Sequence, residues 1–586
     1  MKKRFFTTLL FLTISSFVLS SCQIVPIRQK EKMRLVSAPY KIEYEVGEML
    51  NLNGVRIVDD KSEVEILDYH VEPDEGYKFQ SRDIGDFNLV FSKENYEDLR
   101  FTLKVNGEPV GDEDKTFTIY ATNDIHGQVE NQNSRASIGK MMTYLKDKGS
   151  DGNTLLLDQG DIWQGSIYSN YNYGALITDI MNYVQYDAIT VGNHDFDWGT
   201  QHLIDNHNRS YEGYKTPFLA ANVYGFDFAT KTVLDEQLSE IGDKTVTYTL
   251  DNGLKVGIVG VIGQQQITSI HSLYVRDITF KDHIQVIKEE ATKLRDAGCD
   301  VVIASAHTGE ESVKYYGLEN YVDLVLCGHT HQTENSTDNG LLFAQFGAYN
   351  QNLGHIDLTY HAKTGKVTYD KIEAISERNI ESSVKEIDPV IDGLIDTYEA
   401  ECDSVAKEVV ASNVSGSFYS SEQLPNLMCE AMLDYATESG YEVDLAFCNS
   451  ARASLYDYSW DYADLYQAFP FDNKVYIMEA SYHEMINEIG GYNYLCLSDD
   501  FDRVVEPGKT YKIAVLDFLL FHTNTSRNYD YFDDNNGEYI AELDDNYRVV
   551  LKNYLEKKGF KDGKALNAYE YSQSVDKFSK SFIYGA

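Results

Sequence analysis

Between Thr116 and about Asp357, short apolar runs alternate with helical patterns, and five of the apolar runs end directly in a polar cluster. This alternation predicts an α/β layered domain. The five predicted strands are Phe117–Ala121, Leu155–Leu157, Ala188–Val191, Val301–Ala306 and Leu324–Cys327. Because ligands of open α/β sheets gather at the carboxyl ends of the strands, the clusters predict one site at that edge.

The polar clusters offer oxygen and nitrogen donors in a fixed order. They read Asp124-Ile125-His126, Gly160-Asp161, Gly192-Asn193-His194-Asp195, His307 and Gly328-His329-Thr330-His331. Residues two apart in an extended segment project to the same side, so Asp124 and His126 can grip one ion. The carboxylate of Asp161 can bridge two cations. The predicted metal ligands are therefore Asp124, His126, Asp161, Asn193, His307, His329 and His331.

With these motifs, and with Leu156–Asp161 followed by Gln164-Gly165-Ser166, the region resembles the calcineurin-like metallophosphoesterase superfamily. Within it, the chain is most similar to the bacterial 5′-nucleotidase and UDP-sugar hydrolase family, which includes 2′,3′-cyclic phosphodiesterases. The resemblance is strong over residues 116–360 and weak over 410–586. It implies two divalent ions, of zinc, manganese, cobalt or iron, that activate a hydroxide for attack on phosphorus.

The resemblance also divides the ligands between the two ions. One ion would be held by Asp124, His126, Asp161 and His331, and the other by Asp161, Asn193, His307 and His329. Relatives often have Gln at the position of His331, where imidazole is an acceptable donor.

His194 and Asp197 are the predicted catalytic pair. His194 follows Asn193 directly, so it lies beside the ions without ligating them and can protonate a departing alkoxide. Asp197 falls three positions on, on the same side of a helical turn, where it can fix the imidazole tautomer. The family resemblance assigns the pair the same role, and the alternative is that His194 is a spacer without chemical function.

The resemblance assigns substrate binding to the last domain, through Asn449, Arg452, Phe471 and Phe532. Asn449-Ser450-Ala451-Arg452 is shorter than the family's glycine-rich loop, and Asn528–Tyr531 replaces a further loop. Three functions therefore remain open. They are hydrolysis of nucleotide esters, hydrolysis of a non-nucleotide ester such as a sugar phosphate, and a catalytically inactive surface-binding scaffold.

The amino terminus predicts export. Lys2, Lys3 and Arg4 precede the mostly apolar run Phe5–Val18. Leu19-Ser20-Ser21-Cys22 resembles a bacterial lipoprotein cleavage box, which implies lipidation of Cys22, a cell-surface or periplasmic location, and membrane contact through the anchor alone. The alternative is an ordinary secretory peptide.

The predicted domains follow from changes in pattern. After the signal (1–22) and a polar tether (23–33), residues 34–108 alternate like a β-sandwich and resemble bacterial immunoglobulin-like domains. A four-layer metallophosphoesterase domain (115–365), a linker with a helix (366–409) and an α+β 5′-nucleotidase-type substrate domain (410–586) complete the chain.

The net charge of the chain argues against one class of ligand. With 51 Lys and Arg against 93 Asp and Glu, the formal net charge is −42, so long-range repulsion argues against a nucleic-acid partner. A small nucleotide is not excluded, because metal ions and a local Arg can reverse the field inside a cleft. The predicted ligand is therefore a small phosphate ester.

Overall fold

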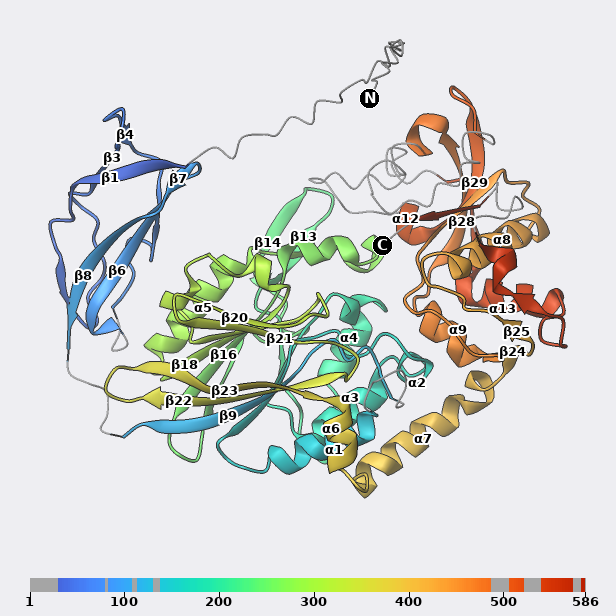
Figure 1. Ribbon diagram of the computed structural model, residues 1–586, viewed down its shortest axis with the longest axis horizontal. Helices are drawn as coiled ribbons and strands as arrows, with labels where there is room; N and C mark the ends of the chain where they lie inside the picture. The colour runs from blue at the N-terminus through green and yellow to red at the C-terminus, as the bar shows by residue number, and fades with distance from the viewer. Residues whose placement is uncertain are drawn as a thin grey trace, which may run out of the picture. The chain divides into compact units, whose positions relative to one another are not determined.

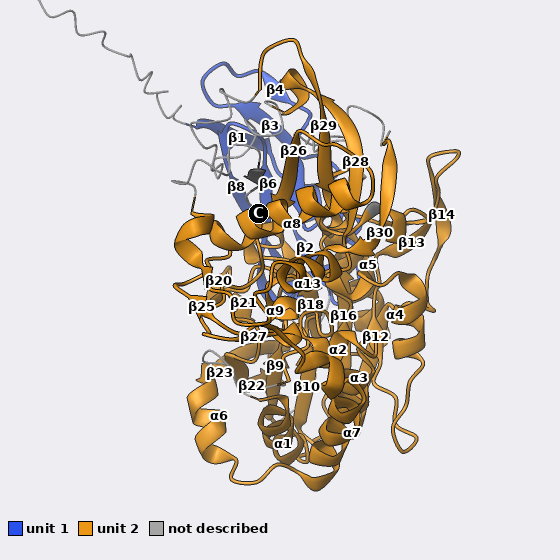
Figure 2. Cartoon of the chain, turned by 90° about the vertical axis from the view of Figure 1, so that its right-hand side faces the viewer, with its two compact units in different colours: residues 1–79, 83–107 blue, residues 80–82, 108–586 orange. Residues whose placement is uncertain are grey.

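The computed structural model describes residues 30–79, 83–107, 113–129, 137–485, 505–520, 539–572 and 581–584. The predicted signal, Cys22 and Phe532 lie outside these residues. The chain forms two compact units, one of residues 1–79 and 83–107 and the other of residues 80–82 and 108–586 (Figure 2).

The first unit contains two four-stranded sheets, in the orders β4-β3-β1-β7 and β2-β8-β6-β5. Tyr44, Phe79 and Phe87 pack inside it, with the Phe79 ring 4.5 Å from Tyr44 and 5.2 Å from Phe87. Strand β1 begins at Glu31, inside the predicted tether, because Glu31 and Lys32 pair with β7. The strands are β1 (Glu31–Ser37), β2 (Glu43–Glu45), β3 (Arg56–Asp59), β4 (Glu65–Ile66), β5 (His70–Glu72), β6 (Gly85–Ser92), β7 (Tyr96–Glu97) and β8 (Leu99–Asn106).

The second unit begins with an α/β domain built on two six-stranded sheets, in the orders β12-β11-β10-β9-β22-β23 and β15-β16-β18-β19-β21-β20 (Figure 1). The first sheet contains β9 (Lys115–Thr122), β10 (Thr154–Asp158), β11 (Ala188–Thr190), β12 (Phe218–Leu219), β22 (Asn352–His361) and β23 (Lys366–Ser376). The second contains β15 (Thr245–Thr249), β16 (Lys255–Ile262), β18 (Val301–His307), β19 (Leu324–Cys327), β20 (Thr333–Asp338) and β21 (Leu341–Phe346). A small third sheet joins β13 (Val223–Asp227), β14 (Thr232–Gln237) and β17 (Ile278–Phe280).

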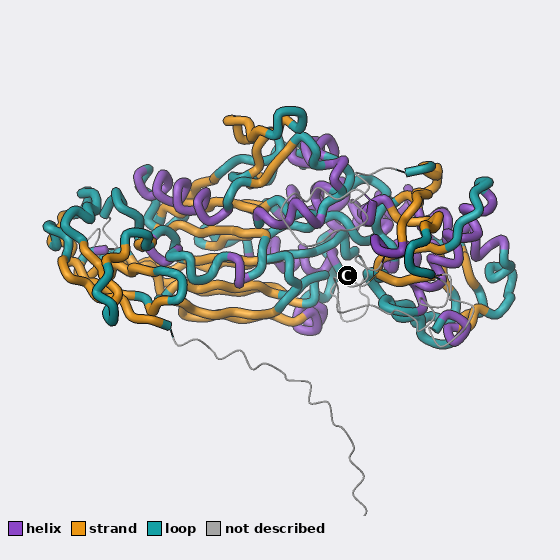
Figure 3. Tube along the Cα trace, turned by 90° about the horizontal axis from the view of Figure 1, so that it is seen from above, coloured by secondary structure: helices purple, strands orange, loops and turns teal. Residues whose placement is uncertain are grey.

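The two large sheets pack face to face through apolar residues such as Ile119, Leu157, Ile258 and Ile303, all fully buried. Helices α1 (Ile138–Lys148), α2 (Ile167–Asn170), α3 (Ala175–Val184) and α4 (Thr200–His207) follow strands of the first sheet. Buried side chains of α1 and α3 share a core with that sheet's outer face, and α5 (His283–Asp296) packs on the second sheet. The two sheets therefore lie as layers between helices (Figure 1), in agreement with the predicted α/β arrangement. Seen from above, the strands run side by side (Figure 3).

The five predicted strands of this domain are confirmed as β9, β10, β11, β18 and β19. The predicted domain end at residue 365 is too early, because β23 pairs with β22 along the edge of the first sheet. Most of its residues are at least partly exposed, as is usual for an edge strand, so the sequence pattern resembles a polar linker.

Two helices connect the α/β domain to the last domain, α6 (Glu377–Ser383) and α7 (Pro389–Ala406). Asp388 caps α7 by accepting hydrogen bonds from the backbone N–H groups of Val390 and Ile391, and Pro389 fits the first helical turn. In the described part of the chain, no helix combines the length and apolar character needed to cross a membrane.

The last domain has a five-stranded sheet in the order β30-β28-β29-β26-β32, with α8 and α13 packed together beside it. Its strands are β24 (Val409–Ala411), β25 (Val414–Ser415), β26 (Leu445–Asn449), β27 (Trp460–Asp461), β28 (Lys474–Ser481), β29 (Thr510–Leu516), β30 (Ala541–Asn546), β31 (Leu566–Asn567) and β32 (Ser581–Tyr584). Its helices are α8 (Gln423–Glu438), α9 (Tyr462–Ala468), α12 (Asp517–Leu520) and α13 (Tyr547–Lys557). The mixture confirms the predicted α+β character of this region.

Asp187 gives the α/β domain a pH-dependent stability. Burial raises the pKa of its carboxyl group to about 7, although the group accepts a 2.8 Å hydrogen bond from the Leu156 N–H. In the unfolded chain an aspartate titrates near about 3.9, so the folded state holds more protons between these values. This contribution to stability is therefore complete below about pH 4 and is lost as the pH rises through about 7.

We expect Asp187→Asn to remove this loss while keeping the hydrogen bond from Leu156. The difference in thermal unfolding midpoint between the variant and the parent should grow in favour of the variant from pH 5 to pH 8. Calorimetric scans across that range measure it. A difference that stays constant with pH would contradict the assignment.

Candidate metal centre

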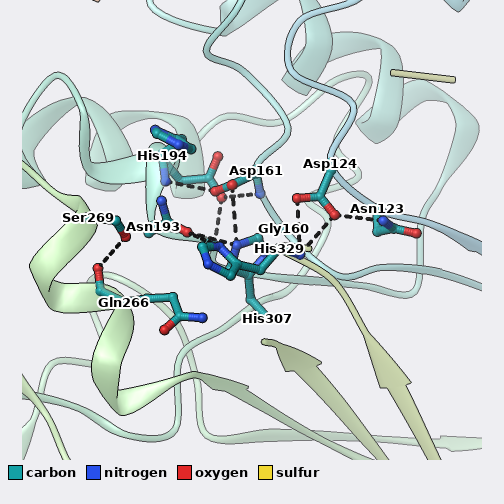
Figure 4. A network of polar contacts seen from close by, with 12 residues as sticks. Asn123, Asp124, Gly160, Asp161, Asn193, His194, Gln266, Ser269, His307 and His329 are labelled. Atoms are coloured by element: carbon teal, nitrogen blue, oxygen red, sulfur yellow. Dashed lines mark hydrogen bonds and ion pairs between the residues drawn. The ribbon is translucent and has the colours of Figure 1, made fainter. Parts of the chain in front are cut away.

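The predicted ligands follow the carboxyl ends of strands from both large sheets. Asp124, Asp161 and Asn193 come shortly after β9, β10 and β11, which are parallel neighbours in the first sheet. His307 ends β18, and His329 and His331 follow β19, its parallel neighbour in the second sheet. Because the two sheets pack face to face, these ends meet in one place (Figure 4).

Three of the donors form a first group. Ligand atoms of Asp124, His126 and His331 all lie within 4.8 Å of one another. The Nε2 atoms of His126 and His331 face each other at 3.1 Å, and His331 Nε2 is 3.5 Å from Asp124 Oδ1. Two imidazole nitrogens and a carboxylate oxygen converging in this way fit a divalent cation.

A second group contains Asp161, His307 and His329, whose ligand atoms also lie within 4.8 Å of one another. His307 Nε2 is 3.3 Å from Asp161 Oδ2, and the amide oxygen of Asn193 is 3.0 Å from His307 Nε2 and 2.9 Å from His329 Nδ1. Asp161 Oδ2 is also 3.9 Å from His126 Nε2 of the first group. Asp161 therefore lies between the two groups.

The backbone supports this convergence in an unusual way. Asp124, His126, Asp161, His329 and His331 all have positive φ angles, between 50° and 72°. Left-handed backbone is uncommon for residues other than glycine and persists where the surroundings enforce it. Gly160 and Gly192 leave no room for a side chain, since a Cβ on Gly160 would lie 2.6 Å from the Gly192 nitrogen. The chain thus turns sharply after each strand and directs the donor side chains inward.

The hydrogen bonds of the rings leave suitable nitrogens for a cation. His126 Nδ1 lies 2.9 Å from the Gln164 carbonyl, and His307 Nδ1 lies 2.7 Å from the Gln159 carbonyl. A proton on each Nδ1 orients the ring and leaves Nε2 as a lone-pair donor toward the centre. Burial lowers the pKa of His126 well below its usual value and that of His329 to about 4, which favours the neutral, metal-binding form.

The buried carboxylates of Asp161 and Asp124 favour positive charge at the candidate metal centre. Burial alone lowers the pKa of His307, yet Asp161 outweighs it and raises the pKa to about 10. Asp161 and Asp124 are both fully buried. Two buried carboxylates among imidazoles fit a pair of divalent cations, whose charge would compensate them.

His194 lies at the rim of this centre in a 3₁₀ turn, His194–Phe196. Its Nδ1 is 2.8 Å from Asp197 Oδ2, and its backbone N–H donates a 2.7 Å hydrogen bond to Asp161 Oδ1. Burial lowers the pKa of His194, but the Asp197 and Asp161 carboxylates outweigh this effect and raise it overall. The structure thus places an imidazole, oriented by the Asp197 carboxylate and with its charged form favoured, next to the Asp161 carboxylate.

Three of the four predicted substrate residues also reach this region. Asn449, Arg452 and Phe471 line a cavity of about 290 Å³ together with His194 and Asp197. The Phe471 ring lies 5.4 Å from the His194 ring, and the Arg452 guanidinium is 5.7 Å from the Phe471 ring centre. Trp198, Tyr274 and His271 of the α/β domain line the same cavity, which the sequence pattern does not indicate.

The sequence pattern does not indicate the role of Asp195, the last residue of the Gly-Asn-His-Asp motif. Its carboxylate accepts hydrogen bonds from the backbone N–H groups of Asp161, Ile162 and Gly192, at 2.8–3.1 Å. It therefore ties the turn after β10 to the turn after β11. An aspartate inside the Gly-Asn-His-Asp motif is a usable signal for such a role, because two consecutive turns need an acceptor for their free N–H groups.

Comparisons with known proteins agree with this fold. Residues 117–333 match the family model described as calcineurin-like phosphoesterase. The chain is 30% identical over 362 residues to a 5′-nucleotidase of Diplobatis ommata and 27% identical over 361 residues to a human 5′-nucleotidase. Each alignment covers 54% of this chain and 59% or 60% of the relative, so the chain matches less than two thirds of these curated relatives' length.

Solved structures show the same fold over more of the chain. The 5′-nucleotidase precursor of Thermus thermophilus covers 77% of this chain and 97% of its own, with a TM-score of 0.61 and 17% identity. A putative 5′-nucleotidase of Staphylococcus aureus covers 75% of this chain and 97% of its own, with a TM-score of 0.58 and 17% identity.

Two packed sheets that bring Asp, Asn and His donors together at their strand ends define a calcineurin-like phosphoesterase domain. Within that superfamily, the chain is similar to 5′-nucleotidases.

Proposed function

We propose that this protein is a two-metal phosphoesterase that hydrolyses nucleotide phosphate esters. The observation that carries the proposal is the position of Asp161, which lies 3.3 Å from His307 of one donor group and 3.9 Å from His126 of the other. A carboxylate between two such groups is suited to bridge two cations. The seven ligands predicted from the sequence are the set we propose for these ions, whose identity as zinc, manganese, cobalt or iron is open.

When bound, two divalent cations lower the pKa of water and offset the negative charge that builds on the phosphoryl oxygens. The chain's own residues supply the rest of the reaction. We assign His194 as general acid, because its Nε2 can give a proton to the leaving oxygen while Asp197 holds Nδ1 at 2.8 Å. Asp197 also stabilises the charged imidazole before the proton is transferred.

The substrate class follows from the cavity beside His194. Phe471 offers a flat aromatic surface there, and Arg452 adds a positive charge near the ring. A planar base can stack on Phe471 while Arg452 attracts the phosphate. Because the relatives are 5′-nucleotidases, we propose 5′-nucleotides first, with 2′,3′-cyclic nucleotides and UDP-sugars as further candidates. Asn449 and Phe532 remain proposed substrate contacts.

A turnover panel tests this function against its alternatives. The purified chain is chelated, reloaded with Mn²⁺, Zn²⁺ or Co²⁺, and assayed with AMP, 2′,3′-cyclic AMP, UDP-glucose and an aryl phosphate diester. We expect metal-dependent hydrolysis of at least one nucleotide, which yields adenosine and phosphate from AMP, an adenosine monophosphate from 2′,3′-cyclic AMP, or UMP and glucose 1-phosphate from UDP-glucose. Turnover of the aryl ester alone would favour a non-nucleotide phosphoesterase, and no turnover with any metal would favour the scaffold alternative.

Removal of the Arg452 side chain tests how the phosphate is held. Charge-assisted hydrogen bonds contribute about 1.5–3 kcal/mol, so Arg452→Ala should raise KM for AMP roughly 10- to 100-fold. Arg452→Lys keeps the charge but loses the forked geometry of the guanidinium. Its KM for AMP should therefore lie between those of the parent and Arg452→Ala. Initial rates over a range of AMP concentrations measure the effect. An unchanged KM in Arg452→Ala would remove Arg452 from the substrate site.

We also propose that residues 1–22 are a lipoprotein signal, that Cys22 carries the lipid and that the mature protein is attached to the cell surface or faces the periplasm. The Leu-Ser-Ser-Cys sequence supports this. We further propose that the first unit is an immunoglobulin-like module, supported by its two four-stranded sheets. Labelling with a fatty-acid precursor tests the anchor, because Cys22→Ser should abolish incorporation.

A further inference from the structure

Gln164 has a buried side-chain amide next to the candidate metal centre. The proposed reaction assigns no role to this amide. The backbone carbonyl of Gln164 lies 2.9 Å from Nδ1 of His126, which fixes the residue beside the first donor group. Its side chain belongs to a residue only 1% exposed, and neither Oε1 nor Nε2 has a hydrogen-bond partner among the residues that the structure describes. Because buried polar groups are normally paired, this amide is available to hydrogen-bond a group that enters the adjoining cavities.

Gln164 lines two cavities that flank the centre. The larger, of about 290 Å³, contains His194 and Phe471, whereas the smaller, of about 180 Å³, contains His126 and Tyr349. Arg452 lines both cavities as well. The smaller cavity lies below the roughly 300–1,000 Å³ of a typical small-molecule site, so by itself it holds only a fragment of a ligand, whereas the larger cavity is close to the lower end of that range.

The smaller cavity opens onto the first donor group. The Tyr349 ring lies 5.1 Å from the His126 ring and 5.2 Å from the His331 ring. The backbone N–H of Tyr349 donates a 2.7 Å hydrogen bond to the Asp124 carbonyl, which fixes the residue there. A group in this cavity therefore lies beside the first donor group, and His194 is not among the residues that line the cavity.

The lining of the smaller cavity mixes donors and acceptors. Amides come from Gln128, Gln164 and Gln467, hydroxyls from Ser166 and Tyr349, and carboxylates from Asp461 and Asp464. Lys407 and Arg452 also line the cavity and offset the two carboxylates, so the lining has little net charge for an ion to pair with. A hydroxyl group can donate to the carboxylates and accept from the amides. The lining therefore suits a sugar-like substituent better than an anion or an apolar chain.

Resting on the proposed phosphoesterase function, we propose that the smaller cavity is a subsite for a hydroxyl-bearing ester group that stays on phosphorus, and that Gln164 contacts the substrate at its entrance. The substrate would then be a phosphodiester whose leaving group occupies the His194 cavity. Water oxygen bonds to phosphorus, the bond from phosphorus to the leaving oxygen breaks, and His194 gives that oxygen a proton. The hydroxyl-bearing group leaves later as part of the monoester product.

Substrates that differ only in the group that stays on phosphorus test whether the smaller cavity recognises hydroxyl groups. Three compounds release the same 4-nitrophenol: 4-nitrophenyl phosphate, propyl 4-nitrophenyl phosphate and 2,3-dihydroxypropyl 4-nitrophenyl phosphate. We expect kcat/KM for the dihydroxypropyl diester to exceed that for the propyl diester about three- to tenfold, the worth of one or two hydrogen bonds. Enzyme-free rates are subtracted. Equal values for the two diesters would overturn the proposal.

Variants on the two sides locate the subsite. Ala463 lines only the smaller cavity, so Ala463→Phe should lower kcat/KM for the diesters about tenfold or more and leave the monoester unchanged. Ser450 lines only the larger cavity, so Ser450→Phe should lower all three values. Gln164→Leu keeps the volume and should remove the preference for the dihydroxypropyl group. Equal losses on all three substrates in Ala463→Phe would contradict the assignment.

Equilibrium binding separates this inference from the proposed function. The affinities of glycerol 3-phosphate and propyl phosphate for the Mn²⁺-loaded protein are compared by calorimetry. The glycerol ester should bind about three- to tenfold more tightly, and Gln164→Leu and Ala463→Phe should each remove the difference. If no substrate is turned over but this difference persists, the hydrolase function fails and the subsite stands. If turnover occurs without the difference, the subsite fails alone.

Discussion

Asp161→Asn should lower metal-dependent turnover by about 10⁴-fold or more, the loss expected when a centre that stabilises transition-state charge is broken. Asp161 is 1% exposed and lies between the two donor groups, so its amide replacement removes the carboxylate positioned to contact both. Metal content should fall below the two ions per chain expected for the parent. Mass spectrometry of the dialysed protein and initial rates measure the two effects.

A neighbouring carboxylate provides the matched control. Asp158 is also fully buried, but its oxygens accept hydrogen bonds from Thr122 Oγ1 at 2.6 Å and from the Gly160 N–H at 2.7 Å. Burial raises the pKa of Asp158 well above its usual value, so a neutral side chain is already favoured there. Asp158→Asn should therefore keep both metals. Two bound ions and near-parental turnover in Asp161→Asn would refute the bridging role.

His194→Ala should lower kcat for AMP by about 10²–10⁴-fold, the usual contribution of a general acid, while both metals remain bound. The imidazole is not among the ligand atoms of either donor group, so its removal leaves the ion contacts in place. Steady-state kinetics and metal analysis on the same preparation test this. Unchanged kcat with full metal content would reduce His194 to a structural spacer.

How strongly the reaction depends on proton donation by His194 should vary with the leaving group. A 4-nitrophenolate ion is stable without a proton, so the loss in His194→Ala should be much smaller for 4-nitrophenyl phosphate than for AMP. Asp197→Asn should give an intermediate loss, because the 2.8 Å contact that orients the ring is weakened but the ring stays. Equal losses on both substrates would mean that His194 binds the phosphoryl group instead of protonating the leaving oxygen.

Much of the candidate site can be predicted from local sequence. Each donor stands directly after an apolar strand, and the order of the motifs predicts that Asp124, Asp161, Asn193, His307 and His329 share one edge. Strand period and turn chemistry are local properties, so β9, β10, β11, β18 and β19 were predictable from residues within each segment. The edge strand β23 was not, because its exposed polar residues resemble a linker when its partner β22 is not considered.

The sequence by itself determined which residues can coordinate a cation, because donor chemistry belongs to the side chain. Only the tertiary structure decided how close together they lie and what surrounds them. Asp161 lies between two groups because two separate sheets pack with their strand ends together. Gln164 lines two cavities with Arg452, and its amide lacks a partner among the described residues, because segments nearly 300 positions apart enclose the same space. Distances between such segments depend on packing, which no local pattern encodes.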